Sequence, residues 1–113
     1  GEVYAELLAW SKQNKLGKPV LTPGVIFSPT NAVIPDLIWV SNGRLETAMD
    51  EAGHLVGAPE LVSEVLSKAQ TDKDRDRGYK LKLYSVEGVQ EYWIFDREQK
   101  MEEVFRRENG ILV

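Results

Sequence analysis

Apolar residues recur at helical spacing at the start of the chain and then gather into short β-rich runs. The stretch EVYAELLAWSKQNK predicts an amphipathic helix over about residues 2–14, with Gly17 as its C-terminal stop. The runs GVIFSP and AVIPDLIWVS contain β-branched and aromatic residues between proline and glycine, and they predict two strands. Pro35 cannot donate to a sheet ladder, so it marks where the second strand begins in earnest.

The second half of the chain continues with alternating strand and helix patterns. The connection NGRLETAMDEAGHLVGAP has room for a helical turn around residues 45–50, and ELVSEVLS predicts a strand. TDKDRDRGYKLKLYSVEG predicts a helix that ends at Gly88. VQEYWIFD and MEEVFRR predict a hairpin with its turn over residues 96–100, and the chain reaches Val113 on a further strand pattern.

This order of elements predicts an α/β fold in which helices flank a mixed β-sheet. Neither an internal repeat nor a low-complexity segment suggests a second unit, so we expect one domain over residues 1–113. The first residue is Gly1 and the last lies in a strand pattern. We therefore expect the domain to be trimmed at both ends.

The amino-acid composition excludes several kinds of functional site. The 113 residues include no cysteine, which excludes disulfides, thiolate zinc sites and a cysteine nucleophile. The sequence shows no apolar run of membrane-spanning length and no signal-peptide pattern, so we expect a soluble, cytoplasmic protein without a membrane partner.

Charge is unevenly distributed. The net charge of -4 argues against a protein that binds nucleic acid with its whole surface. A local basic patch remains possible between residues 68 and 82, where six basic residues occur: Lys68, Lys73, Arg75, Arg77, Lys80 and Lys82.

Two acids fall on strands where they could meet. Strand alternation places Asp36 on the face of Ile38 and Val40, and it places Glu60 and Glu64 together on one face of a later strand. Glu60 and Glu64 stand roughly 13 Å apart in a strand, too far to bind one ion together. Pairing of the two strands would bring Asp36 to Glu64.

Paired carboxylates on a half-buried sheet repel each other unless a cation or a shared proton intervenes. With no cysteine and one histidine, an oxygen-coordinated Mg²⁺ or Mn²⁺ is the consistent cation. Asp76, Lys80 and Tyr84 follow at helical spacing, so Lys80 could reach such a centre and stabilise charge on a phosphate oxygen or hold a water. Two acids, a metal and a lysine suit phosphodiester hydrolysis.

Four ordered blocks carry a family resemblance: PDLIWV, GAPELVSEVLS, DRGYKLKLY and GVQEYWIFD. Over about residues 33–104 they resemble the bacterial Uma-type family of predicted restriction endonucleases, common in cyanobacteria. That family is part of the PD-(D/E)xK nuclease superfamily. The resemblance implies a restriction-endonuclease-like fold.

The resemblance also implies roles for individual residues. Asp36 matches the aspartate of PD, and Glu64 matches the acid of (D/E)xK. The third position of that triplet is Leu66 instead of lysine, and Lys80 in the following helix is the matching cation. Glu60 replaces the aspartate of the family's APD, and Glu2 is the nearest candidate for an N-terminal helix acid that completes the site.

Simpler interpretations remain open for each of these residues. Asp36 could initiate a turn after Pro35, and Glu64 could be a solvated edge acid. Lys80 could be surface charge, for which Lys82, on a different helix face, is the natural control. The only histidine, His54, fits an exposed loop residue better than a general base. Core packing explains the following aromatic residues better than base stacking does: Trp39, Tyr92, Trp93 and Phe95.

We therefore predict a metal-dependent DNA endonuclease in which Asp36 and Glu64 bind Mg²⁺ or Mn²⁺ and Lys80 assists. DNA is the expected partner, and a homodimer is expected because cutting both strands needs two sites. The alternative is a catalytically inactive nuclease-fold module for binding or assembly. A metabolic enzyme unrelated to nucleic acid ranks third, because no cofactor motif is visible.

Overall fold

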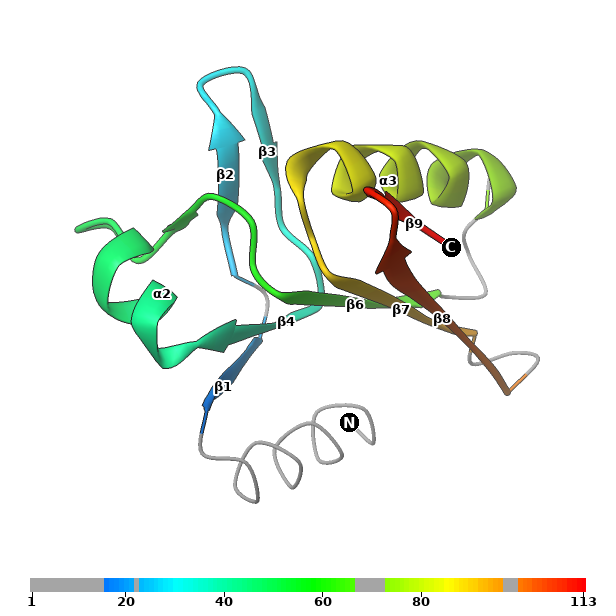
Figure 1. Cartoon of the computed structure of the whole chain (residues 1–113), viewed down its shortest axis with the longest axis horizontal. Helices are drawn as coiled ribbons and strands as arrows, with labels where there is room; N and C mark the ends of the chain where they lie inside the picture. Colours follow the sequence, from blue (N-terminus) through cyan, green and yellow to red (C-terminus); the bar gives the residue numbers. More distant parts are fainter. Residues whose placement is uncertain (1–15, 22, 67–72, 97–99) are drawn as a thin grey trace.

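The computed structural model describes residues 16–21, 23–66, 73–96 and 100–113. The helix predicted over residues 2–14 lies outside this part of the chain. Within it, the α/β architecture is confirmed: a large mixed sheet carries a helix and a small second sheet on one face (Figure 1). No helix among the described residues has the length and apolar character of a membrane span.

Six strands form the large sheet. Their order across it is β1 (Gly17–Leu21), β4 (Leu37–Ser41), β6 (Leu61–Leu66), β7 (Glu91–Asp96), β8 (Met101–Glu108) and β9 (Ile111–Leu112). All neighbours in this sheet are antiparallel except β6 and β7, which run parallel. Parallel neighbours need a crossover connection, and the helix α3 (Lys73–Glu87) lies within it.

The small sheet has the order β3 (Asn31–Val33), β2 (Val25–Ser28), β5 (Leu55–Val56). A short helix, α2 (Asn42–Ala48), follows β4. The hairpin of β2 and β3 projects away from the large sheet beside α3 (Figure 1).

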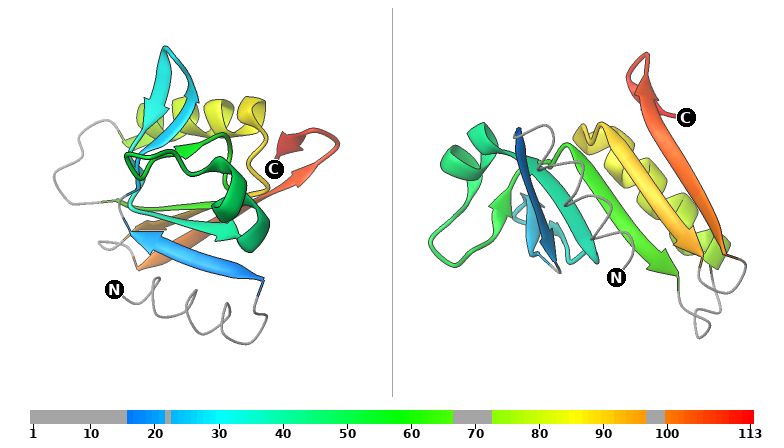
Figure 2. Two further views of the ribbon diagram at one scale, coloured as in Figure 1. Left: turned by 90° about the vertical axis from the view of Figure 1, so that its left-hand side faces the viewer. Right: turned by 90° about the horizontal axis from the view of Figure 1, so that it is seen from below.

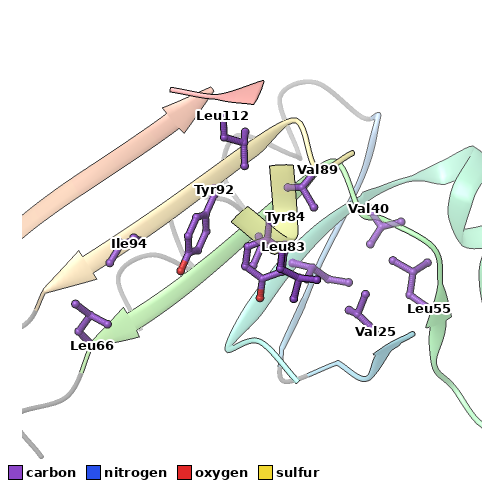
Figure 3. Packing of buried hydrophobic residues seen from close by; sticks show 12 residues of the cluster. Val25, Val40, Leu55, Leu66, Leu83, Tyr84, Val89, Tyr92, Ile94 and Leu112 are labelled. Atoms are coloured by element: carbon purple, nitrogen blue, oxygen red, sulfur yellow. The ribbon is translucent and has the colours of Figure 1, made fainter. Parts of the chain in front are cut away.

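One main core joins α3 and both sheets. Its members come from six strands, from α3 and from the turn after α3, and Figure 3 shows them converging between the helix and the sheet. At its centre the rings of Tyr84 on α3 and Tyr92 on β7 meet edge to face, with centroids 4.9 Å apart. Both tyrosines are almost fully buried, as expected for apolar anchors of a core.

The opposite face of the large sheet holds a second cluster. Its buried members are Leu37, Trp39 and Leu61. Strand alternation therefore divides β4 as predicted, with Ile38 and Val40 in the main core.

Several elements differ from the sequence prediction. The strand predicted across residues 32–41 is two strands, β3 and β4, separated by Ile34, Pro35 and Asp36. The helical turn expected at residues 45–50 is α2, which begins earlier, at Asn42. The strands β1 and β5 were not predicted, whereas β6, α3, β7 and β8 lie where expected and Gly88 follows α3 with a φ of 92°.

Gly17 is the first residue of β1. It opens β1 opposite Ser41, and a Cβ atom there would collide with the Val40 carbonyl oxygen and the Trp39 indole. A glycine is required because the two backbones approach closely. The helix that Gly17 was predicted to end lies outside the described residues, so its role as a helix stop stays a prediction.

Arg107 on β8 fastens the end of α3 to the sheet. Its guanidinium donates to the carbonyl oxygens of Tyr84 (3.2 Å), Ser85 (2.7 Å), Val89 (3.0 Å) and Gly110 (2.7 Å). Carbonyls in the last turn of a helix lack partners within the helix, and a cation there also opposes the helix dipole. This single side chain therefore fixes α3 relative to the edge of the sheet.

We expect Arg107→Met to lower the free energy of unfolding by about 2 to 3 kcal/mol, because it removes four charge-assisted hydrogen bonds to carbonyls, three of them partly buried. Urea unfolding followed by circular dichroism measures the loss. Arg106→Met is the matched control: its side chain is 72% exposed and contacts Glu91 on the surface. We expect a change within about 0.5 kcal/mol for the control, and equal losses in both variants would contradict the fastening role.

Candidate active site

The parallel pair β6 and β7 and the helix between them form the frame of the site. Glu64 is the fourth residue of β6, and it faces α3 together with Val62 and Leu66. Figure 2 (right) shows α3 crossing behind the strands of the large sheet. Side chains of the helix and the strands pack together in the main core, as Tyr84 and Tyr92 do. A strand acid and a helix residue can therefore come into contact although sixteen positions separate them in sequence.

Lys80 contacts both oxygens of the Glu64 carboxylate. Its Nζ lies 3.1 Å from Oε1 and 2.9 Å from Oε2. The Glu64 side chain is 10% exposed and that of Lys80 is 25% exposed, so the pair is largely removed from water but open on the lysine side. The predicted association of Glu64 with Lys80 is observed in the structure.

Tyr92 is a third member of the site that the sequence analysis assigned only to the core. Its hydroxyl donates to Glu64 Oε2 at 3.3 Å. The register places Tyr92 beside Val62, two residues before Glu64 and on the same face. Contacts with Tyr84 and Phe105 hold the ring, so the hydroxyl has a fixed position.

Asp36 directly precedes β4, which neighbours β6 on the side opposite β7. The antiparallel register pairs Leu37 with Ser63, and continuing it by one residue brings Asp36 opposite Glu64. Asp36 is exposed, and its Oδ2 accepts a hydrogen bond of 2.7 Å from the Val65 backbone N–H. The two acids of the predicted pair are thus neighbours, one buried and one exposed.

The electrostatics of the site centre on Glu64. Burial raises the pKa of its carboxyl, Lys80 opposes that rise, and the Asp36 charge adds to it. The hydrogen bond from Tyr92 lowers the same pKa, as the smallest of these contributions. Burial outweighs the favourable partners, so the ionised carboxylate is held at a cost in free energy.

Glu60, a further candidate, is engaged elsewhere. Its Oε1 accepts a hydrogen bond from the Ser41 backbone N–H at 3.0 Å, and its Oε2 lies 3.4 Å from Arg44 Nε. Glu60 therefore ties the strand that holds Leu61 to the start of α2, at a distance from Lys80.

The remaining predicted residues are placed as follows. Glu2 lies outside the described residues, and of Asp76 only the backbone, within α3, is described. Lys82 is exposed, on a different face of α3 from Lys80. His54 is half-exposed and pairs with Asp50, whose Oδ2 lies 3.1 Å from its Nδ1, as suits a loop residue. The described residues contain no group of three acidic, histidine or cysteine side chains that could hold a metal.

The family model "Uma2: Putative restriction endonuclease" matches residues 1–113. The chain belongs to the Uma2 family. No curated protein matches the sequence. Among solved structures, a "putative nuclease belonging to DUF820" from Anabaena variabilis ATCC 29413 is similar, with a TM-score of 0.67 and 19% identity. The match covers 94% of this chain but 64% of that one, so the Uma2 chain described here spans less than two thirds of its structural neighbour.

We expect the Glu64 carboxyl to titrate above its ordinary value of 4.5, because burial disfavours the charged form. Lys80→Met should raise this pKa further, and Tyr92→Phe should raise it by less, since the lysine stabilises the carboxylate more strongly. Carbon-detected NMR titration of the glutamate carboxyls measures all three values. A Glu64 pKa that falls in either variant would contradict these contributions.

The raised pKa also sets the pH dependence of stability. A folded pKa above the unfolded value stabilises the protein below pH 4.5, and this contribution is lost as pH rises through the folded pKa. Relative to Glu64→Gln, the wild type should therefore lose stability as pH rises above 4.5, as measured by urea unfolding over a pH series.

Asp50 provides a control of opposite sign, because the backbone hydrogen bond from His54 lowers its pKa below 3.8. Relative to Asp50→Asn, the wild type should lose stability as pH falls through that region. The same sign in both pairs of proteins would contradict the assignment for Glu64.

Proposed function

We propose that this Uma2 domain is a metal-dependent endonuclease that hydrolyses phosphodiester bonds of DNA. The observation that carries the proposal is a buried carboxylate, Glu64, bound by a helix-borne lysine and flanked by a second acid, Asp36. Buried charged groups that are costly to ionise are frequent at catalytic sites. Family membership and the fold shared with the "putative nuclease" from Anabaena variabilis support the same class of reaction.

The residues present fit a hard divalent cation. Asp36 and Glu64 supply carboxylate oxygens, the donors that Mg²⁺ and Mn²⁺ prefer. The position beside Glu64 already accepts positive charge, since the Lys80 ammonium lies 2.9 Å from Oε2. Mg²⁺ commonly keeps several waters and uses one or two protein carboxylates, so two such side chains are sufficient.

We assign Asp36 and Glu64 as the residues that would hold the ion. When bound, a divalent ion polarises the phosphate and lowers the pKa of a coordinated water. Lys80 would place its positive charge beside the scissile phosphate, where negative charge increases during attack on phosphorus, or would orient the attacking water. Tyr92 would keep the Glu64 carboxylate in one orientation throughout.

We expect Glu64→Gln and Lys80→Met each to reduce nicking of supercoiled plasmid with Mg²⁺ or Mn²⁺ by roughly 100-fold or more, as removal of one charge-stabilising group typically does. The rate is measured from the conversion of supercoiled to open-circular DNA. Lys82→Met is the control on the same helix, because Lys82 is exposed on another face, and it should retain most of the activity.

Equal nicking by the wild type and Glu64→Gln would contradict the catalytic assignment. The alternative, an inactive nuclease-fold module for binding or assembly, would be favoured if DNA binding persisted without Mn²⁺ uptake. Calorimetric titration with Mn²⁺ separates the two.

We also propose a homodimer, since cleavage of both DNA strands needs two sites. The β7–β8 hairpin carries exposed apolar surface at Val104, which is 39% exposed and could contribute to such an interface. Light scattering over a range of protein concentrations tests the prediction. A monomer at high concentration would remove it.

A further inference from the structure

The two oxygens of the Glu64 carboxylate have different numbers of hydrogen-bond donors beside them. Lys80 Nζ contacts both, at 3.1 Å and 2.9 Å, whereas the Tyr92 hydroxyl contacts Oε2 alone. A divalent ion that binds Glu64 must approach the same oxygens. Two cations beside one carboxylate repel each other, and the repulsion is stronger in a site largely shielded from water.

We propose that the Lys80 ammonium and the divalent ion are alternative partners of Glu64. In the metal-free protein the ammonium neutralises the carboxylate, and ion entry moves it off at least one oxygen. This inference rests on the proposed role of Glu64 as a metal ligand. It goes further because it predicts that Lys80 weakens metal binding, whereas a residue that supports a metal site would strengthen it.

The two partners of Glu64 differ in their freedom to move. The Lys80 side chain extends from α3 and is 25% exposed. Because a lysine side chain has a flexible four-carbon stem, its ammonium can shift toward solvent or a substrate. The Tyr92 ring is almost fully buried between Tyr84 and Phe105. Tyr92 can therefore hold Glu64 in place while Lys80 leaves.

This exchange has a chemical benefit for phosphodiester hydrolysis. An ammonium displaced by the ion stays on α3, whose C-terminal end Arg107 fixes to β8. It remains near the ion and is then able to contact a phosphate oxygen. Metal binding would thus deliver the lysine to the substrate in the same step.

The test is the affinity for Mn²⁺ alone, measured by calorimetry at mildly alkaline pH. We expect Lys80→Met to bind Mn²⁺ about 10-fold more tightly than the wild type, which corresponds to about 1.4 kcal/mol, because the competing ammonium is gone. Lys82→Met, on the other face of α3, should bind as the wild type does. Glu64→Gln should lose the binding, which shows that the titrated site is this one.

A second measurement needs no substitution of Lys80. In the wild type, Mg²⁺ titration followed by NMR should shift the Lys80 side-chain resonances and the Glu64 carboxyl resonance with one midpoint, while Lys82 stays constant. Lys80 resonances that do not respond, or an equal or weaker Mn²⁺ affinity in Lys80→Met, would overturn the exchange.

Failure of the proposed function looks different. If Lys80→Met binds Mn²⁺ more tightly but the wild type nicks no DNA, the exchange stands and the hydrolase activity falls. If neither the wild type nor Lys80→Met takes up Mn²⁺, both the metal site and the exchange are refuted.

Discussion

The burial of one carboxylate constrains much of this structure. Glu64 lies in the middle of β6, on the face that packs against α3, and its side chain is 10% exposed. Leaving such a charge without a partner costs on the order of 3 to 5 kcal/mol, comparable with much of the stability of a small domain. The lysine that offsets this cost comes from α3, so the position of that helix matters as much as the strand. Arg107 and the core around Tyr84 set that position.

Much of this could be predicted from the sequence, because it depends on local pattern. β6, α3, β7 and β8 have clear periodicity and were predicted close to their observed bounds. Strand alternation put Asp36 and Glu64 on faces that could meet, and helical spacing selected Lys80 over Lys82. The family resemblance implied a displaced lysine, because Leu66 occupies the position where the (D/E)xK motif has its lysine. That Lys80 touches Glu64 is the part of the candidate site that the geometry supports directly.

The rest depends on pairing between distant segments, which sequence alone does not specify. β5 has two residues and exists because it lies against β2, while β1 depends on the close approach of Gly17 to β4. Tyr92 was interpreted as a core residue, which is correct for its ring. Its hydroxyl reaches Glu64 only because β7 runs parallel to β6 in a particular register. Glu64 was preferred over Glu60 from the sequence, but the role that Glu60 has instead, as the acceptor for the Ser41 backbone N–H, became visible only in the structure.

Asp36 differs from Glu64 in how its presence in related chains should be interpreted. Its Oδ2 accepts the Val65 backbone N–H at 2.7 Å, so the side chain extends the hydrogen bonding between β4 and β6 just beyond the end of β4. An aspartate here has a structural use whether or not the protein cleaves anything. A descendant that has lost catalysis can keep Asp36 for the sheet, so this aspartate by itself does not indicate catalysis. Under the proposed function, the pair at positions 64 and 80 is therefore a better marker of active family members than Asp36 is.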